Sequence, residues 1–184
     1  CVVPPGAVDG GVMAGTKWAL GVRGLALLLM VLAVFPVSAA TPYQTQSIVL
    51  LQPDFVLKER VPSIESLSGY IKSVQAATEA TMGREAPSPA SGFVVLAVRP
   101  GGRSMVWLDF QPELPDAVAA RLTQAIQAVP PFEARGGVVV FALNATLWDA
   151  PAAQGFPNPS AWRKAMEGRS EPMEIGDLVD KVWP

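Results

Sequence analysis

Apolar and polar side chains follow the periodicity of strands and helices most clearly between residues 92 and 149. Residues 93–99 are apolar on both faces, which is typical of a strand that is covered on both sides. A Pro-Gly-Gly sequence then predicts a hairpin loop, and residues 103–110 alternate as a returning strand does. A helical stripe over 116–129 and an alternating run at 138–148 complete a predicted strand–strand–helix–strand unit.

The last strand of this unit has two different faces. The odd-numbered face is strongly apolar and should pack on the helix; it consists of Val139, Phe141, Leu143, Ala145 and Leu147. The even-numbered face is milder, and it includes Val140, Ala142, Asn144 and Thr146. We therefore expect the even-numbered face to be partly open to solvent or to a partner.

The segment before the unit, residues 41–91, is expected to form an extended lead-in followed by a helix. The apolar run at 47–51 is a candidate edge strand, and residues 55–57 should continue the same layer. Ser63 is a preferred N-cap residue, and apolar residues at helical spacing predict a core-facing helix from there to about Thr81. That apolar stripe consists of Ile64, Leu67, Ile71 and Val74.

The tail, residues 150–184, is broken by Pro and Gly and predicts only short helices, over 161–167 and 177–182. Trp162 and Trp183 are the residues that we expect to pin the tail to the body. The predicted fold class is therefore α+β, with a small antiparallel sheet packed against helices.

The N-terminal region has the features of a secretory signal peptide. Residues 13–40 contain a basic start, an apolar run and the small residues that a signal peptidase accepts, so we expect cleavage after Ala40 or one residue earlier. Residues 1–12 would then be upstream sequence from an early start assignment. The alternative is an uncleaved anchor at 18–39, since a spanning helix needs roughly 20 apolar residues. The bias towards Ala, Gly, Pro, Val and Arg indicates a bacterial source, and the predicted location is periplasmic or secreted.

Charge and residue usage exclude several classes of chemistry. The chain has 14 Lys and Arg against 16 Asp and Glu, so it offers no basic stripe for nucleic acid and no polybasic membrane patch. It has no histidine, and its one cysteine is Cys1. Zinc sites built from Cys and His, nucleophiles activated by histidine, and disulfide frameworks are therefore excluded. No cofactor is expected, although Ca²⁺ or Mg²⁺ binding by oxygen atoms alone stays open.

Asp109 is the best-placed carboxylate in the sequence for chemistry. It lies near the end of the second predicted strand, where an ion pair with Arg99 or Arg103 across the hairpin is the expected arrangement. A hydrolase built on two carboxylates would need a second acid close by, and Glu113 is the near candidate.

Residues 92–149 resemble the C-terminal domain of the TonB family. The resemblance rests on the order of Gly92, the Pro-Gly-Gly loop, Pro130-Pro131-Phe132 and the last strand. It implies a small periplasmic domain that accepts a partner strand at a sheet edge. In this sequence the edge would fall on the even-numbered residues of the last strand, Val140, Ala142, Asn144 and Thr146.

The leading interpretation is an exported, non-enzymatic binding or envelope-assembly protein whose partner is another envelope protein. The alternatives are a membrane-anchored TonB-like adaptor and a small carboxylate-dependent periplasmic hydrolase. A pair of carboxylates in one cleft would favour the hydrolase. An exposed apolar groove or an unpaired sheet edge would favour the binding protein.

Overall fold

The computed structural model describes residues 40–171 and 173–183. The described residues form one antiparallel sheet and five helices, so the predicted α+β class is confirmed. In chain order the elements are β1 (Gln44–Leu50), α1 (Asp54–Arg60), α2 (Ile64–Met82), β2 (Ala90–Arg99), β3 (Arg103–Gln111), α3 (Asp116–Gln127), β4 (Val139–Leu147), α4 (Ser160–Met166) and α5 (Ile175–Val182). The predicted signal peptide, the uncleaved-anchor alternative and the upstream segment lie outside the described residues, apart from Ala40.

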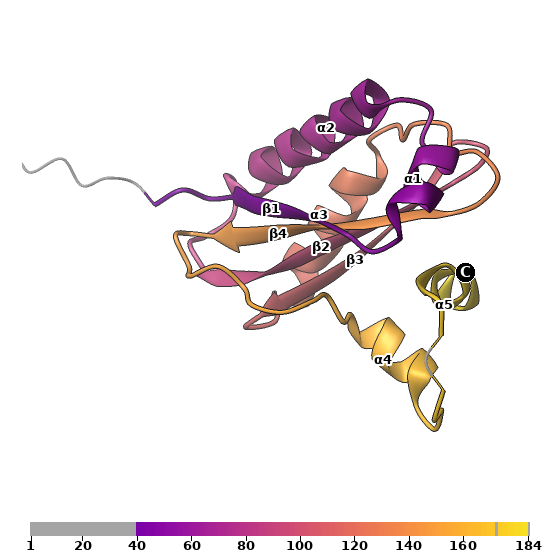
Figure 1. Ribbon diagram of the computed structural model, residues 1–184. Coiled ribbons are helices and arrows are strands. Elements are labelled where there is room, and N and C mark those ends of the chain that lie inside the picture. Colours follow the sequence, from indigo (N-terminus) through magenta and orange to yellow (C-terminus); the bar gives the residue numbers. More distant parts are fainter. Residues whose placement is uncertain (1–39, 172, 184) are drawn as a thin grey trace, which may run out of the picture. The chain divides into compact units, whose positions relative to one another are not determined.

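The four strands lie in the order β1-β4-β2-β3, and every neighbouring pair is antiparallel (Figure 1). The apolar run at 47–51 therefore contributes an edge strand, as predicted. In contrast, β4 lies inside the sheet, because β1 and β2 occupy its two edges. Phe141, for example, is opposite Leu50 of β1 on one side and Leu96 of β2 on the other.

The expectation that β4 offers an open edge or an open face is therefore wrong. Val140 and Ala142 are fully buried, and Thr146 retains 3% of its exposure. The polar side chains of this face are hydrogen bonded within the domain: Asn144 Nδ2 donates to Ala153 O at 3.0 Å, and Gln46 Nε2 donates to Thr146 Oγ1 at 3.0 Å. The physical reason is that β1 and the tail supply the neighbours that the sequence pattern of β4 does not specify.

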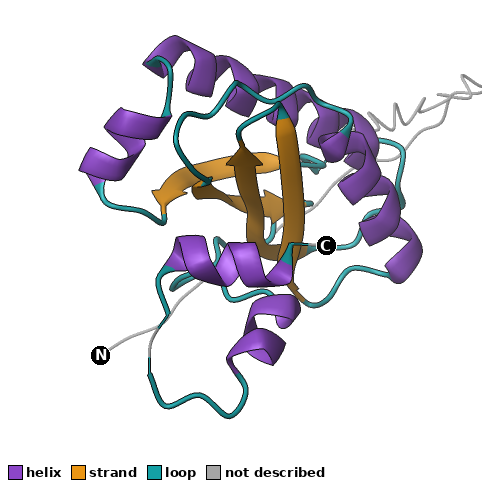
Figure 2. Cartoon of the chain, turned by 90° about the vertical axis from the view of Figure 1, so that its right-hand side faces the viewer, coloured by secondary structure: helices purple, strands orange, loops and turns teal. Residues whose placement is uncertain are grey.

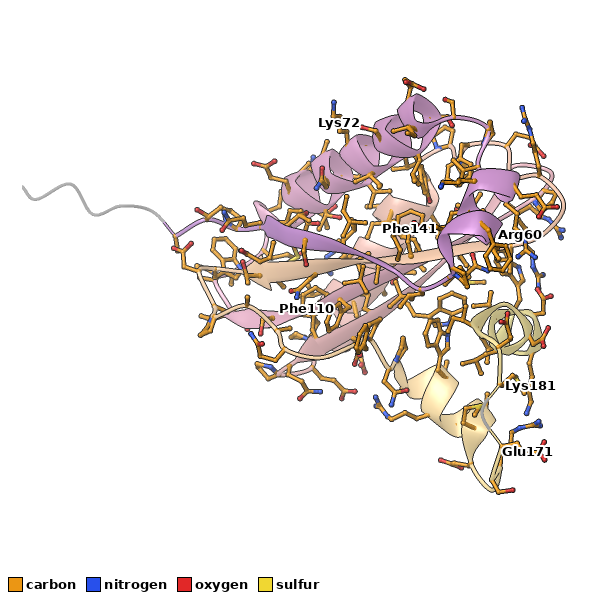
Figure 3. All side chains as sticks on the ribbon, viewed as in Figure 1. Arg60, Lys72, Phe110, Phe141, Glu171 and Lys181 are labelled. Carbon is orange, nitrogen blue, oxygen red and sulfur yellow. The ribbon has the colours of Figure 1, made fainter. Side chains whose placement is uncertain are left out.

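One face of the sheet packs against α2 and α3, and the prediction for the odd-numbered face of β4 is confirmed. Val139, Phe141, Leu143, Ala145 and Leu147 are all fully buried in this layer. They meet Ile71 and Val74 of α2, and Leu122 and Ile126 of α3. Tyr70 of α2 packs edge-on against Phe141, with ring centroids 6.4 Å apart. Figure 3 labels Phe141.

The C-terminal tail covers the other face of the sheet (Figure 1 and Figure 2). Trp162 of α4 is buried there and meets Trp107 of β3 edge-on, at 5.8 Å between centroids. Trp183 packs on the same cluster and lies 4.1 Å below the guanidinium of Arg99, which also pairs with Asp180. The two tryptophans expected to pin the tail therefore do so.

The connection from β1 to β4 continues through a side chain. Beyond the end of β1, the buried amide of Gln52 donates from Nε2 to Val138 O at 3.1 Å and accepts from Val140 N at 2.9 Å. The Gln52 amide thus continues the hydrogen bonding between β1 and β4 by one step, where a backbone group of β1 would otherwise bond. Pro53 then starts α1, so the expectation of an extended segment at 55–57 is wrong.

The helix predicted from Ser63 is confirmed as α2, with a reciprocal capping box between Ser63 and Ser66. Its apolar stripe is only partly core. Ile71 and Val74 are buried, whereas Ile64 is 82% exposed. The stripe therefore continues past the core into solvent at the first turn of α2.

Candidate partner-binding site

The free edge of β1 is the open side of the sheet. One edge of β1 pairs with β4, and no strand pairs with its other edge within the described residues. Its sequence, Gln-Thr-Gln-Ser-Ile-Val-Leu, contains no charge and no proline. Natural edge strands are usually protected from pairing by such residues or by bulges. Here the one irregularity is a register shift between Thr45 and Ser47, which leaves the rest of β1 regular.

The opposite edge of the sheet, β3, is less suited to accept a strand. Arg103 and Asp109 lie within β3, and its side chains are engaged by neighbouring elements. Gln127 of α3 contacts Met105, and the α4 region contacts Asp109. The uncharged β1 is thus the better candidate for strand addition.

Two apolar side chains of β1 point to the α2 side of the sheet but are not covered by it. Ile48 is opposite Leu143 and Leu50 is opposite Phe141, and both β4 partners belong to the α2 layer. Directly opposed residues share a face, so Ile48 and Leu50 lie on that face as well. They nevertheless remain 48% and 47% exposed.

Beside these two side chains lies an apolar groove, which consists of two adjacent hollows. The first, of about 300 Å³, is bordered by Ile48 and by the α2 residues Ile64, Leu67, Ser68, Ile71, Lys72 and Gln75. The second, of about 400 Å³, is bordered by Leu50, Asp54, Leu57, Lys58, Val61, Pro62, Ser63, Ile64 and Leu67. Ile64 and Leu67 border both hollows, so the two form one groove between β1 and the helices. We call this surface the β1–α2 groove.

The charged side chains of the groove lie at its rim. Lys72 borders the first hollow and is marked in Figure 3. Lys58 and Asp54 border the second. Both lysines are exposed, and neither makes an ion pair within 4.0 Å in the described part of the chain. The groove therefore combines an apolar floor with a rim of two lysines and one aspartate.

Asp109 does not make the cross-hairpin ion pair that the sequence predicts. Its carboxylate accepts a hydrogen bond from Asn158 N at 2.6 Å and lies 3.9 Å from Arg163. Arg99 is instead engaged with the α5 region, as described above. The tail causes this difference, because it brings polar groups to Asp109 that the pairing of β2 with β3 cannot reveal.

Asp109 and Glu113 do not share a cleft. Asp109 borders a hollow of about 380 Å³ beside the tail, and Glu113 borders a different one of about 170 Å³ beside α3. Across residues 40–171 and 173–183, no group of three Cys, Asp or Glu residues is arranged to hold a metal ion. Within the same residues, no helix is long and apolar enough to cross a membrane.

Another hollow, of about 600 Å³, lies between the end of α2 and α3. Two of its charged residues form an ion pair: Arg121 donates to both oxygens of Glu85, each at 2.7 Å. This hydrogen bonding lowers the pKa of Glu85 and raises that of Arg121. The one carboxylate of this recess is therefore already paired.

The sequence indicated part of the groove and missed the rest. It identified the apolar run containing Ile48 as an edge strand, but it assigned Ile64 to the core and placed the accepting edge on β4. The available signal was that Ile64 directly follows the N-cap, where a helix often extends past the layer that it covers. No family model, no curated protein and no solved structure matches this chain.

Proposed function

We propose that this protein is an exported, non-enzymatic binding protein that accepts an extended segment of a partner protein along the free edge of β1. One observation carries the proposal: the uncharged edge of β1 lies directly beside an apolar groove. An edge alone offers unpaired backbone groups, and a groove alone offers apolar surface. Their combination is what strand addition requires, because backbone pairing gives affinity and side-chain pockets give specificity.

The exposed apolar residues support this proposal by their grouping. The large hydrophobic side chains that are most exposed in the described residues are Ile48, Leu50, Phe55, Ile64 and Phe156. Three of them, Ile48, Leu50 and Ile64, border the β1–α2 groove. Scattered exposed hydrophobic residues are common on any protein, whereas a contiguous group beside a groove is typical of an interaction site.

The proposed partner is another envelope protein, which follows from the predicted signal peptide. Strand addition is also what the resemblance to TonB C-terminal domains implies, although here the accepting strand is β1. The carboxylate hydrolase has no comparable support, because Asp109 and Glu113 border separate hollows.

Peptide selection combined with hydrogen exchange tests the proposal. A library of random extended peptides is selected on the full chain, and the bound peptides are mapped by amide exchange. We expect bound peptides to slow amide exchange in residues 44–50. The variant Ile48→Lys puts a charge on this edge, so it should bind the same peptides at least about tenfold more weakly. The matched control is Phe156→Lys, which removes another exposed apolar side chain outside the groove. Selected peptides that protect a different segment, or a library that yields no binder, would overturn the proposal.

A further inference from the structure

The geometry points to a specific sequence pattern in the bound segment: two apolar side chains separated by one residue, with an acidic side chain two positions beyond each of them. This inference rests on the proposed strand addition at β1 and adds the chemical class of the ligand. It follows from the spacing of the two hollows and from the charges at the rim of the groove.

The spacing comes from β1 itself. Ile48 borders the first hollow and Leu50 the second, so the hollows are two strand residues apart. In a strand, every second side chain lies on the same face, about 6.6–6.8 Å further along. A strand paired to β1 therefore presents the side chains opposite Ile48 and Leu50 to the two hollows in turn. The residue between them faces the other side of the sheet, as Val49 does.

The linings of the hollows specify apolar side chains. Leu67 and Ile64 form the shared wall, Ile71 adds to the first hollow, and Leu57 and Val61 add to the second. A polar side chain in either hollow would lose hydrogen bonds to water without gaining a partner. Branched aliphatic or aromatic side chains are therefore the expected occupants.

The charges at the rim specify the flanking residues. Lys72 borders the first hollow and Lys58 borders the second, so each hollow has one positively charged side chain. A strand that places apolar side chains over both hollows brings the next side chain on the same face towards a lysine at either end. Since each hollow has its own lysine, the preference for acidic flanking residues holds whether the added strand runs parallel or antiparallel to β1. Asp54 beside Lys58 weakens the attraction there, so Lys72 should contribute more.

The test uses a labelled peptide of the sequence Glu-Thr-Val-Thr-Leu-Thr-Glu and the full chain, with binding followed by fluorescence anisotropy. A second peptide, Glu-Val-Thr-Thr-Leu-Thr-Glu, has the same composition but the wrong apolar spacing. We expect the second peptide to bind at least about tenfold more weakly, because only one of its apolar side chains reaches a hollow. A third peptide, with lysine in place of both glutamates, should bind about twofold to tenfold more weakly than the first. This difference in affinity should shrink at high salt.

Charge reversal on the protein provides the complementary arm. Lys72→Glu should weaken the glutamate peptide and strengthen the lysine peptide, whereas the matched control Lys164→Glu, on α4, should change neither. Equal binding of the two peptides that differ only in spacing would overturn the inference, as would a glutamate preference that Lys72→Glu leaves unchanged. If selected peptides without this pattern still protect β1 from exchange, the inference fails while the proposed function stands. If no peptide of any pattern protects β1, both fail.

Discussion

Gly92 lies in β2, where the backbone of β3 leaves no room for a side chain. It lies inside β2 rather than before it, and a Cβ atom built on it would be 2.0 Å from the carbonyl oxygen of Asp109 and 2.6 Å from the Cα of Phe110. The neighbouring atoms belong to the backbone, so they cannot move aside as a flexible side chain can. This close contact, and not a positive φ angle, is therefore what requires glycine at position 92.

We therefore expect Gly92→Ala to reduce the free energy of unfolding by roughly 1–3 kcal/mol, or to prevent folding. The matched control is Gly69→Ala at an exposed position of α2, where an added Cβ atom would meet no neighbouring element within 4 Å. That change should stabilise the protein by about 0.5–1 kcal/mol, because alanine is the better helix former. Urea unfolding midpoints of the two variants measure both effects, and a Gly92→Ala variant as stable as the wild type would contradict the close approach.

Phe141 and Ile64 are both large and apolar, but they should differ in what they contribute to stability. Phe141 is fully buried between the sheet and α2, so Phe141→Ala should cost roughly 3–5 kcal/mol through lost burial and a cavity. Ile64 is 82% exposed, so Ile64→Ala should change stability by about 0.5 kcal/mol or less. Thermal and urea unfolding compare the two. A large loss with Ile64→Ala would mean that the first turn of α2 is part of the core and that the groove is not open.

Among the connections between elements, the amide of Gln52 joins the end of β1 to the start of β4. Gln52→Ala should cost roughly 1–3 kcal/mol, because Val140 N loses its acceptor while it stays buried. Val138 O keeps a second donor, since Arg60 also donates to it at 2.8 Å. Gln52→Glu is the informative partner variant: an ionised carboxylate can accept from Val140 N but cannot donate to Val138 O. Its stability should therefore recover as the pH falls and the carboxyl gains a proton, which unfolding curves between neutral and acidic pH can show.

The contact between α2 and α3 includes a pair whose contribution depends on pH. Hydrogen bonds from Arg121 hold the pKa of Glu85 below its ordinary value in the folded state. A carboxyl with a depressed folded pKa stabilises the fold above its unfolded pKa, and that contribution is lost as the pH falls through the folded pKa. Glu85→Gln should therefore be less stable than the wild type at neutral pH, and the difference should disappear in acid. A difference that is constant across this range would show that the ion pair does not contribute.

At the level of the whole molecule, the sheet is a middle layer, with α2 and α3 on one face and the C-terminal tail on the other. The tail buries Phe93, Val95, Val140 and Ala142 on the face opposite α2 and α3. Without the tail, this face would be a contiguous apolar surface, which soluble domains rarely expose. The tail is therefore a structural layer of the domain rather than an appendage.

A chain that ends at Asp149 tests this role. We expect it to bind the dye ANS strongly and to aggregate, because the uncovered face is apolar along both β2 and β4. A milder control is Trp162→Ala, which should cost roughly 3–5 kcal/mol while the rest of the tail stays in place. A shortened chain that remained monomeric, with an unchanged melting temperature, would contradict the layered arrangement.

The sequence by itself determined the type and the faces of most elements, because these depend on periodicity within a short window. The alternation in β4 identified Phe141 and Leu143 as core positions, and Ser63 identified the start of α2 through the chemistry of its cap. Trp162 and Trp183 stood out as anchors because they are the largest apolar side chains of the tail. In each case the information lies in a few consecutive residues.

Only the tertiary structure decided the order of the strands, and with it the candidate site. β1 and β4 are separated by most of the domain in sequence, and nothing in either strand specifies that they pair. That pairing places β4 inside the sheet and leaves β1 at the edge. It also brings Ile48 and Leu50 beside Ile64, three residues that the sequence assigns to separate elements. The groove exists because distant segments meet, and local periodicity carries no information about which distant segments those are.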